Sequence, residues 1–288
     1  MKLYPFSVLS AGVLMMGCTP LGPSQQGTPH PGDKFSIALV FPENASLNNQ
    51  QKSLFVQAAR RWEQVITQGL PDVGGATPVD DIVITASATQ IDGPGKVMSR
   101  SGPLLVREGN HLPITGMIEF DLYDLQAREI DGTLKNVILH EMGHVLGIGT
   151  IWNRYLKYDN QTGCLDSSRI TYTGTHANQQ FHQLGEQGLI PVENQYGAGN
   201  KCGHWDEETF KSELMTGFST SNPMPLSKMT IGALQDLGYR VNYNAADPYS
   251  LPFSGVQAQH HNAEEHHEIL TVPRVLKAGE TLIVDGLQ

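Results

Sequence analysis

The sequence predicts an α+β fold, with a mixed, twisted N-terminal sheet, two long helices and a loop-rich second half that ends in a further helix. Three observations support this prediction. Short apolar runs typical of strands alternate with two longer stretches whose apolar residues recur at helical spacing. The second half is instead rich in Gly, Asn, Tyr and Thr, with little periodicity. Finally, 30 glycines, 17 prolines and a charged fraction of only 17% indicate a loop-rich globular protein.

Three strands are expected in the first half of the chain. They are predicted where short runs are apolar or alternate apolar with polar residues, at residues 35–41, 81–88 and 114–123. In the last of these runs, Ile118, Phe120 and Leu122 fall on one face of the strand. The intervening residues 93–113 predict a long loop.

Helices are expected where apolar residues recur every three or four positions. This spacing occurs at residues 48–68 and 131–146, and glycines follow both stretches. A third helix is predicted near the end of the loop-rich half, where Ser227 supplies an N-cap and Gly238 a stop. With the strands, these helices define a first half of regular elements followed by a loop-rich second half.

The elements group into one domain at residues 35–252, with an N-terminal subdomain at 35–149 and a C-terminal subdomain at 150–252. Residues 253–288 form a tail that follows this domain. The tail contains glutamates and four histidines, namely His260, His261, His266 and His267. Such a composition could collect a metal, but we interpret the tail as a solvated polar linker.

The first residues predict export. A positive charge precedes an apolar run at residues 6–16, which suits the core of a signal peptide and is too short to span a bilayer. The run ends in MMGC, which is similar to the lipobox of bacterial lipoproteins. We therefore expect a signal peptide at residues 1–17, a lipid anchor at Cys18 and a Pro/Gly-rich tether at 18–34, which fatty-acid labelling would test. The protein would be a cell-envelope lipoprotein at the outer membrane or cell surface, and an ordinary secreted protein is the alternative.

Charge and cysteine content limit the partners. The net charge is −10, and no cluster of Lys and Arg is longer than Arg60-Arg61, which excludes the electrostatic footprint of a nucleic-acid-binding protein. The chain is long and apolar enough to fold alone, and we expect a monomer. Once Cys18 is lipidated, Cys164 and Cys202 remain, and an even pair in an oxidising compartment predicts a disulfide.

The strongest functional motif is HEMGH at residues 140–144, within the second long helix. At about 3.6 residues per turn, His140 and His144 lie on the same helix face and can bind one zinc ion. Glu141 lies beside that ion, while the opposite face is apolar and points to the core. The alternative is a surface helix whose histidines have other partners.

A catalytic zinc site needs a third protein ligand and leaves its fourth position for water. In the commonest metzincin pattern the third histidine follows six residues after the second, but Thr150 occupies that position here. The remaining candidates are His176, His182 and His204. His182 falls in a short polar helical stretch, where a solvated role is expected. His204 is favoured because it lies two residues after Cys202 and eleven before Met215.

Three blocks together resemble leishmanolysin and its bacterial relatives, which are metzincins with a segment inserted before the third histidine. The blocks are residues 140–147 (HEMGHVLG), 204–208 (HWDEE) and 213–215 (ELM). The resemblance covers most of residues 35–252 and implies a metzincin-like fold. It also implies the site residues: His140, His144 and His204 as zinc ligands, Glu141 as general base and Met215 in the Met-turn. Without it, Met215 could be an ordinary core methionine.

The activity implied by the resemblance is that of a zinc-dependent endopeptidase acting on proteins or peptides. Zinc held by three neutral imidazoles polarises a peptide carbonyl and activates water, and Glu141 would move the proton of that water to the leaving amine. In metzincins an edge strand beside the active-site helix pairs with an extended substrate. Residues 114–123, which precede that helix, are expected to bind a peptide in this way. The spacing assigns no residue to the oxyanion.

Two other functions stay open. One is a catalytically silent, zinc-containing binding module or adhesin on the same fold, against which the intact Glu141 argues. The other is a gluzincin-type peptidase with Glu213 as its third zinc ligand, in which His204→Ala would keep its zinc.

Leishmanolysin itself also implies latency, because a propeptide cysteine is thought to block its zinc. In this sequence Cys18 is the only cysteine before the HEMGH motif. We therefore expect no cysteine-based latency.

Overall fold

The computed structural model describes residues 33–74, 78–160, 162–197, 199–219, 223–252, 264–265, 267–278, 280 and 282. The predicted signal peptide, Cys18 and nearly all of the tether lie outside these residues, so export and lipidation stay predictions. Among the described residues, no helix combines the length and the apolar character needed to cross a membrane.

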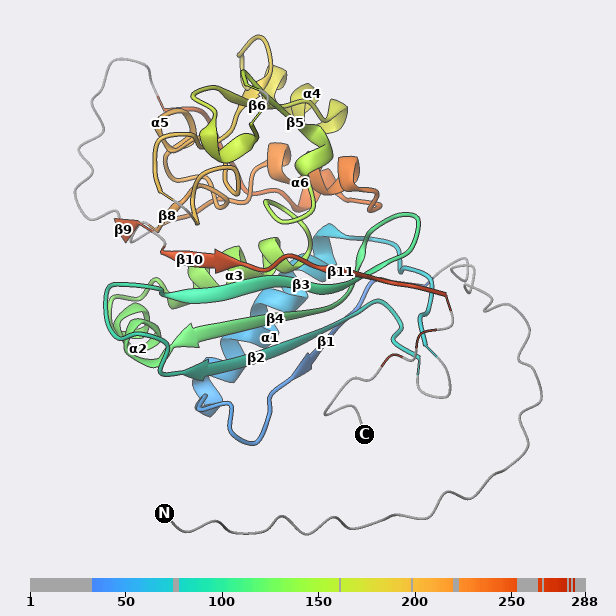
Figure 1. The fold of residues 1–288 in the computed structure, drawn as a ribbon, viewed down its shortest axis with the longest axis vertical. Helices are drawn as coiled ribbons and strands as arrows, with labels where there is room; N and C mark the ends of the chain where they lie inside the picture. Colours follow the sequence, from blue (N-terminus) through green and yellow to red (C-terminus); the bar gives the residue numbers. More distant parts are fainter. Residues whose placement is uncertain are drawn as a thin grey trace, which may run out of the picture.

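A mixed sheet forms the core of the N-terminal half (Figure 1), which confirms the predicted sheet type. Its first strands are β1 (Ile37–Val40), β2 (Ile82–Thr89), β3 (Ser99–Arg107) and β4 (Pro113–Asp121). The strands β1, β2 and β4 are parallel neighbours, and β3 pairs antiparallel with the far side of β4. Because β4 has a partner on both sides, the expectation that residues 114–123 form the peptide-binding edge is wrong. The strand β3 lies next to β4 on the side of α3, and its other side pairs with β10 and β11.

The strand β3 occupies the place of the long loop predicted at residues 93–113. Its side chains do not alternate apolar and polar, because Ser99 and Ser101 are buried while Leu104 is exposed. A Gly-Pro pair in its middle, both of them uncommon in strands, hides the pattern further. The strand was missed because its inward positions carry hydroxyl groups rather than apolar groups.

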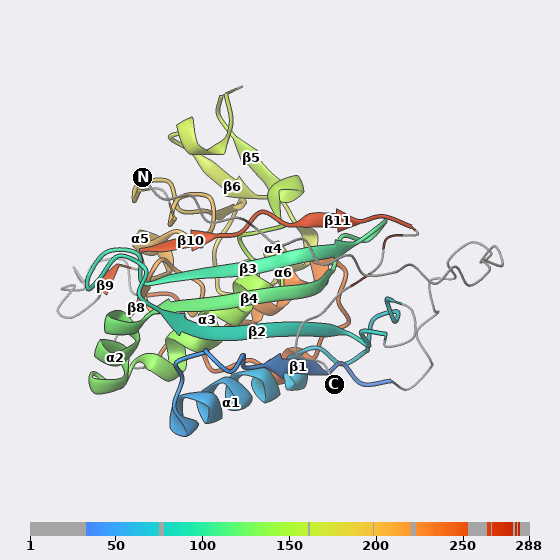
Figure 2. The same cartoon turned by 60° about the horizontal axis from the view of Figure 1, so that its bottom comes forward.

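One face of the sheet is covered by two long helices (Figure 2), namely α1 (Asn49–Val65) and α3 (Leu134–Val145). The helix α1 begins at a capping box in which Asn48 and Gln51 each accept a hydrogen bond from the other's backbone N–H. From its buried face, Trp62 donates a hydrogen bond of 3.0 Å from Nε1 to the carbonyl of Leu139. This bond and the surrounding apolar contacts fix α3 against α1.

A shorter helix, α2 (Leu122–Ile130), was not predicted and connects β4 to the loop before α3. Asp121 caps α2, because its carboxylate accepts a hydrogen bond of 2.9 Å from the backbone N–H of Tyr123. Its only buried apolar residue is Leu125, so the sequence shows no broad apolar stripe there. Because Asp131 is the C-cap of α2, the next helix, α3, begins at Leu134 and not at residue 131.

The second half is built from short elements, as its weak periodicity indicates. Its helices are α4 (Thr175–Gln183), α5 (Glu207–Phe210), α6 (Lys228–Leu237) and the 3-10 turns Asn153–Tyr155, Cys164–Asp166 and Tyr243–Ala245. Its strands are β5 (Leu156–Tyr158), β6 (Ile170–Tyr172), β7 (Ile190–Pro191) and β8 (Phe218–Ser219). The helix α6 begins after Ser227 and stops at Gly238, where the sequence predicted both ends. A disulfide joins Cys164 to Cys202, and the division into two subdomains stays a prediction.

The tail returns to the sheet, which contradicts its interpretation as a solvated linker. Its strands are β9 (Glu264–Glu265), β10 (Glu268–Leu270) and β11 (Arg274–Leu276). The strand β9 pairs with β8, while β10 and β11 run parallel to β3 along its outer edge (Figure 1). Strand addition uses backbone groups, and Ile269 and Val272 stay exposed, so the sequence carries no apolar face that would predict docking. His260, His261 and His266 lie outside the described residues, and His267 is exposed.

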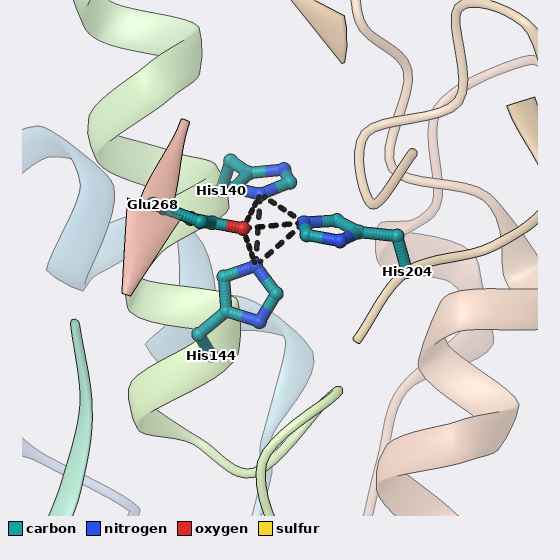
Figure 3. A group of neighbouring side chains, drawn as sticks. All are labelled: His140, His144, His204 and Glu268. Carbon is teal, nitrogen blue, oxygen red and sulfur yellow. Dashed lines mark hydrogen bonds and ion pairs between the residues drawn. The ribbon is translucent and has the colours of Figure 1, made fainter. Parts of the chain in front are cut away.

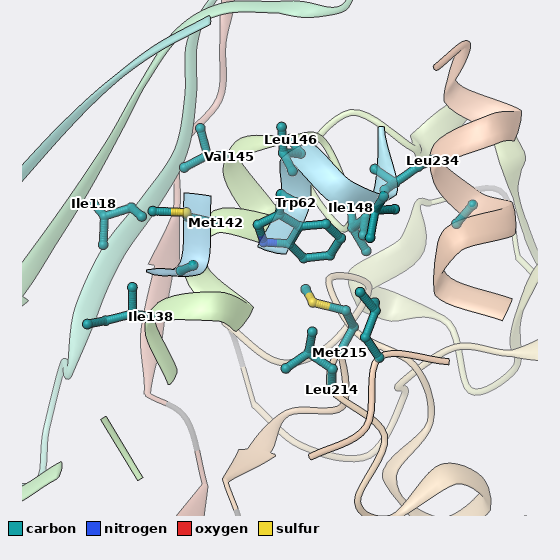
Figure 4. Close-up of a cluster of buried hydrophobic side chains, with 14 of the residues drawn as sticks. Trp62, Ile118, Ile138, Met142, Val145, Leu146, Ile148, Leu214, Met215 and Leu234 are labelled. Carbon is teal, nitrogen blue, oxygen red and sulfur yellow. The ribbon is translucent and has the colours of Figure 1, made fainter. Parts of the chain in front are cut away.

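The helix α3 is packed into one core that joins both halves of the chain (Figure 4). Met142 and Val145 pack toward the sheet, in the same cluster as Ile118 of β4. On another side of α3, Met215 lies so close to Gly143 that an added Cβ would meet its Sδ at 2.7 Å. The apolar contacts on both sides hold the HEMGH segment rigidly in place.

Candidate metal centre

Three histidine side chains from two distant segments meet at one point (Figure 3). His140 and His144 project from the same face of α3, and their Nε2 atoms are 2.8 Å apart. His204 comes from the loop after Cys202, and its Nε2 lies 3.1 Å from each of the other two. All three side chains are fully buried. The structure therefore brings together the three histidines that the resemblance implied as ligands.

The second ring nitrogen of each histidine fixes its tautomer. The Nδ1 atoms lie 2.6, 2.8 and 3.0 Å from backbone carbonyl oxygens, which belong to Leu214, Ile148 and Asn200 for His140, His144 and His204 respectively. A carbonyl oxygen can only accept a hydrogen bond, so each Nδ1 carries the proton and donates it. In the neutral rings, all three Nε2 lone pairs then point at one another. This is the arrangement found where histidines bind a metal.

The donor set fits a divalent metal such as zinc. Imidazole nitrogens at about 2.0–2.1 Å from a tetrahedral zinc ion lie about 3.3 Å apart, close to the observed spacings. Three convergent lone pairs in a buried site repel one another unless a cation lies between them. The other way to satisfy them is to protonate one ring, which would then pair with a nearby carboxylate.

That carboxylate is Glu268 of β10, which completes a buried group of four possible ligands. Its Oε1 lies 2.6 Å from Nε2 of His204, 3.2 Å from that of His144 and 3.7 Å from that of His140. Neither carboxylate oxygen accepts a hydrogen bond from a described hydroxyl or backbone donor. Burial disfavours its charge, but the adjacent His144 and His204 hold the pKa of Glu268 well below its usual value.

Glu141 lies beside this group, with its side chain fully buried. Its Oε1 accepts a hydrogen bond of 2.8 Å from the hydroxyl of Ser99 on β3. Burial, and after it the like charge of Glu268, raises the pKa of Glu141 well above its usual value. A divalent cation at the imidazoles would favour its ionised form instead. Ser99 thus acts as a positioning residue that holds Glu141 toward the histidines.

The segment around Met215 contacts both His140 and the helix α3 that carries it. The carbonyl of Leu214 accepts the Nδ1 proton of His140, and Met215 itself is buried against α3. Glu213 does not reach the histidines, because its carboxylate accepts hydrogen bonds from other groups. These donors are the backbone N–H groups of Met215 and Ser227 and the hydroxyls of Ser227 and Thr230, at 2.5 to 3.1 Å. A ligand role for Glu213, as in a gluzincin, therefore has no support in this geometry.

The other histidine candidates are not part of the cluster. His182 on α4 is exposed, and its Nε2 lies 2.8 Å from the carbonyl of Gly188. Within the described residues, His176 is also absent from the group that could hold a metal. The sequence left His204 as one of three candidates, and the geometry favours it over the other two.

Two residues of the site were missed at the sequence level. Glu268 is one of several glutamates in the tail, and only the apolar run after it (ILTV) indicates a strand. Ser99 lies in the segment expected to be a loop. Both residues reach the site through strand pairing at β3, which the local sequence does not indicate.

The fold and the donor set define a class of protein: a metalloprotein with an HExxH helix packed under a mixed sheet. Comparison with protein families gives the particular family. A family model described as leishmanolysin (Peptidase_M8) matches residues 70–254, more than half of the chain. The chain therefore belongs to the leishmanolysin family of metallopeptidases.

Known relatives agree with this assignment over a short stretch. A leishmanolysin-like peptidase of Caenorhabditis elegans is 40% identical over 57 residues, which are 19% of this chain and 8% of the relative. Leishmanolysin-like peptidases of Drosophila melanogaster and Drosophila pseudoobscura pseudoobscura are each 38% identical, over 58 and 60 residues. These stretches cover 20% of this chain in both cases, and 8% and 9% of the relatives. The chain thus matches less than a tenth of the length of each relative.

Proposed function

We propose that this chain is a zinc-dependent endopeptidase with His140, His144 and His204 as metal ligands and Glu141 as general base. The observation that carries the proposal is the convergence of three Nε2 lone pairs, each fixed by a carbonyl at Nδ1, beside a buried glutamate. Three neutral imidazoles with an adjacent carboxylate are the donor set that HExxH peptidases use. Membership of the leishmanolysin family supports the same function.

The protein residues would divide the chemistry between them. Bound zinc supplies a Lewis acid that polarises a peptide carbonyl and makes water nucleophilic near neutral pH. The Oε2 of Glu141 meets no hydrogen-bond donor in good geometry among the described residues, although Ser101 and Glu268 lie close enough to shift the pKa of Glu141, so this oxygen could take a proton from the attacking water. Ser99 holds the other oxygen and keeps the carboxylate in place. Glu141 would then deliver the proton to the leaving amine.

The substrate class follows from the sheet. The strand β3 runs past the metal centre, and the outer edge of β3, which pairs with β10 in this structure, has the backbone groups that could bind an extended chain in the place of β10. Strand addition grips a peptide along its length and needs no charged subsite for a terminus. We therefore propose cleavage within extended or unfolded segments of proteins.

One observation favours the alternative of a silent zinc-binding module. Glu268 would give the metal four protein ligands, and closed four-ligand sites are typical of structural zinc. Against this stands Glu141, a buried carboxylate that a purely structural site does not need.

The test is cleavage of an unfolded protein by the zinc-loaded full chain, assayed for the wild type and for Glu268→Gln. We expect at least one of them to cleave, a zinc chelator to abolish cleavage, and added zinc to restore it. Mass spectrometry of the products should show internal cleavage sites. The proposal fails if both proteins carry one zinc per chain and neither cleaves unfolded proteins.

A further inference from the structure

We propose that residues 267–276 of the tail act as a built-in inhibitor, which occupies the peptide-binding edge of β3 and supplies the fourth metal ligand through Glu268. This inference rests on the proposed peptidase function and concerns the regulation of the same site. Its basis is that one segment fills both places that a substrate needs: the strand edge and the open coordination position.

The first place is the edge of β3. The register pairs Glu268 with Ser99 and Leu270 with Ser101, so the tail strand lies beside the two buried serines of β3 in the same sheet. Main-chain bonds hold it there: the N–H of Met98 donates to the carbonyl of His267 at 2.6 Å, and the N–H of Thr271 to that of Ser101 at 2.8 Å. An extended substrate would need the same backbone groups of β3. Tail and substrate therefore cannot bind this edge together.

On the side away from β3, the tail strand packs closely against a loop that contains two glycines. This is the loop that carries His204, where Gly199 and Gly203 face β10. A Cβ at Gly199 would lie 2.5 Å from the carbonyl oxygen of Glu268, and one at Gly203 would lie 2.7 Å from Cδ1 of Leu270. A side chain at position 199 would push the backbone of the strand away, whereas one at position 203 would require only the Leu270 side chain to move. The tail is thus held between β3 and the loop of His204.

The second place is the coordination position. A catalytic zinc site keeps one position open for water or substrate, whereas four protein ligands close it. If the three imidazoles bind a zinc ion, the carboxylate of Glu268, which lies beside all three Nε2 atoms (Figure 3), would fill the remaining position. The carboxylate of Glu268 is buried and accepts no hydrogen bond from a described hydroxyl or backbone donor, so a bound metal ion would stabilise its charge.

The same contacts make the tail removable. Leu276 is the only buried apolar side chain among the described tail residues, while Ile269 and Val272 are exposed. The docked strand is held mainly by main-chain hydrogen bonds and by one carboxylate, not by a core. Its release would therefore expose little apolar surface and leave the rest of the fold intact.

The experiment measures access to the metal in the full chain after substitution of zinc by cobalt. Acetohydroxamate is the probe, because it binds an open metal position and changes the visible spectrum of cobalt. We compare the wild type with Glu268→Gln, which weakens the ligand, and with Thr271→Pro, which removes one main-chain donor and keeps all four ligands. Glu280→Gln is the matched control, because Glu280 is an exposed tail glutamate that binds Arg274. Cleavage of an unfolded protein is assayed in parallel on the zinc forms.

We expect both tail variants to bind the probe about tenfold or more tightly than the wild type and the control, since the closed form reduces apparent affinity by the fraction of open sites. Hydrogen exchange at β10 should be faster in Thr271→Pro. Equal probe affinity in all four proteins would overturn the proposal that the tail is an inhibitor. Cleavage by the wild type would then still support the proposed peptidase function. Tighter probe binding without cleavage in any protein would support occupation of the site by the tail and end the peptidase proposal.

Discussion

Replacement of Glu141 by Gln should lower kcat/KM for peptide cleavage by about 10²–10⁴-fold, the usual contribution of a general base. The amide of Gln cannot take a proton from water, but it has nearly the same shape and can still accept the hydrogen bond of Ser99. Zinc binding should not change, because Glu141 is not one of the four clustered ligands. The measurement is steady-state cleavage of a fluorogenic peptide together with zinc content.

The comparison is best made with Glu268→Gln present in both proteins, so that the tail does not mask the activity. Glu119→Gln is a suitable control, because Glu119 lies on β4 and pairs with Arg100 away from the histidines. If the Glu141→Gln protein keeps its zinc and cleaves as fast as its parent, another group must activate the water.

Replacement of His204 by Ala should reduce zinc affinity by more than about 100-fold, since loss of an outer partner of a ligand alone costs about 10–100-fold. Two histidines and Glu268 would remain, and the cavity left by the buried ring would destabilise the loop after the disulfide. Competition with a chromogenic chelator measures the affinity, and peptide cleavage should be lost in parallel.

His182→Ala is the matched control, because this histidine is exposed on α4 and should leave zinc affinity unchanged. Glu213→Gln separates the account from the gluzincin alternative. We expect the Glu213→Gln protein to keep its zinc while losing stability, because Glu213 accepts hydrogen bonds from Ser227 and Thr230. Zinc retained by His204→Ala and lost by Glu213→Gln would show that the third ligand had been assigned wrongly.

The long elements of the first half, apart from β3, and the helix α6 could be predicted because each has a local signal. The helices α1, α3 and α6 have apolar stripes, and α1 and α6 also have side-chain caps, while β1, β2 and β4 are short apolar or alternating runs. The elements that were missed lack such signals. In β3 the inward residues include Ser99 and Ser101, and α2 buries a single apolar residue. The tail strands depend on main-chain pairing with β3, which is set by tertiary structure.

The residues of the candidate site also differ in how far the sequence predicts them. His140, Glu141 and His144 lie within one helical turn, so their spacing alone predicts a metal-binding face. The positions of Cys202 and Met215 favoured His204, and the family pattern strengthened this choice, but no local spacing shows that the chain folds back to bring His204 near α3. Glu268 had no signal of its own, since a single glutamate in a polar tail is indistinguishable from its neighbours until the strand is docked.

The proposed chemistry depends on one divalent ion bound by three imidazoles, and X-ray absorption of the purified full chain tests this binding most directly. We predict one zinc per chain, with three imidazole nitrogens and one carboxylate oxygen at about 2.0–2.2 Å. In Glu268→Gln the three nitrogens should remain and the oxygen signal should change. A protein without stoichiometric metal, or a zinc with fewer than three imidazole ligands, would contradict the account.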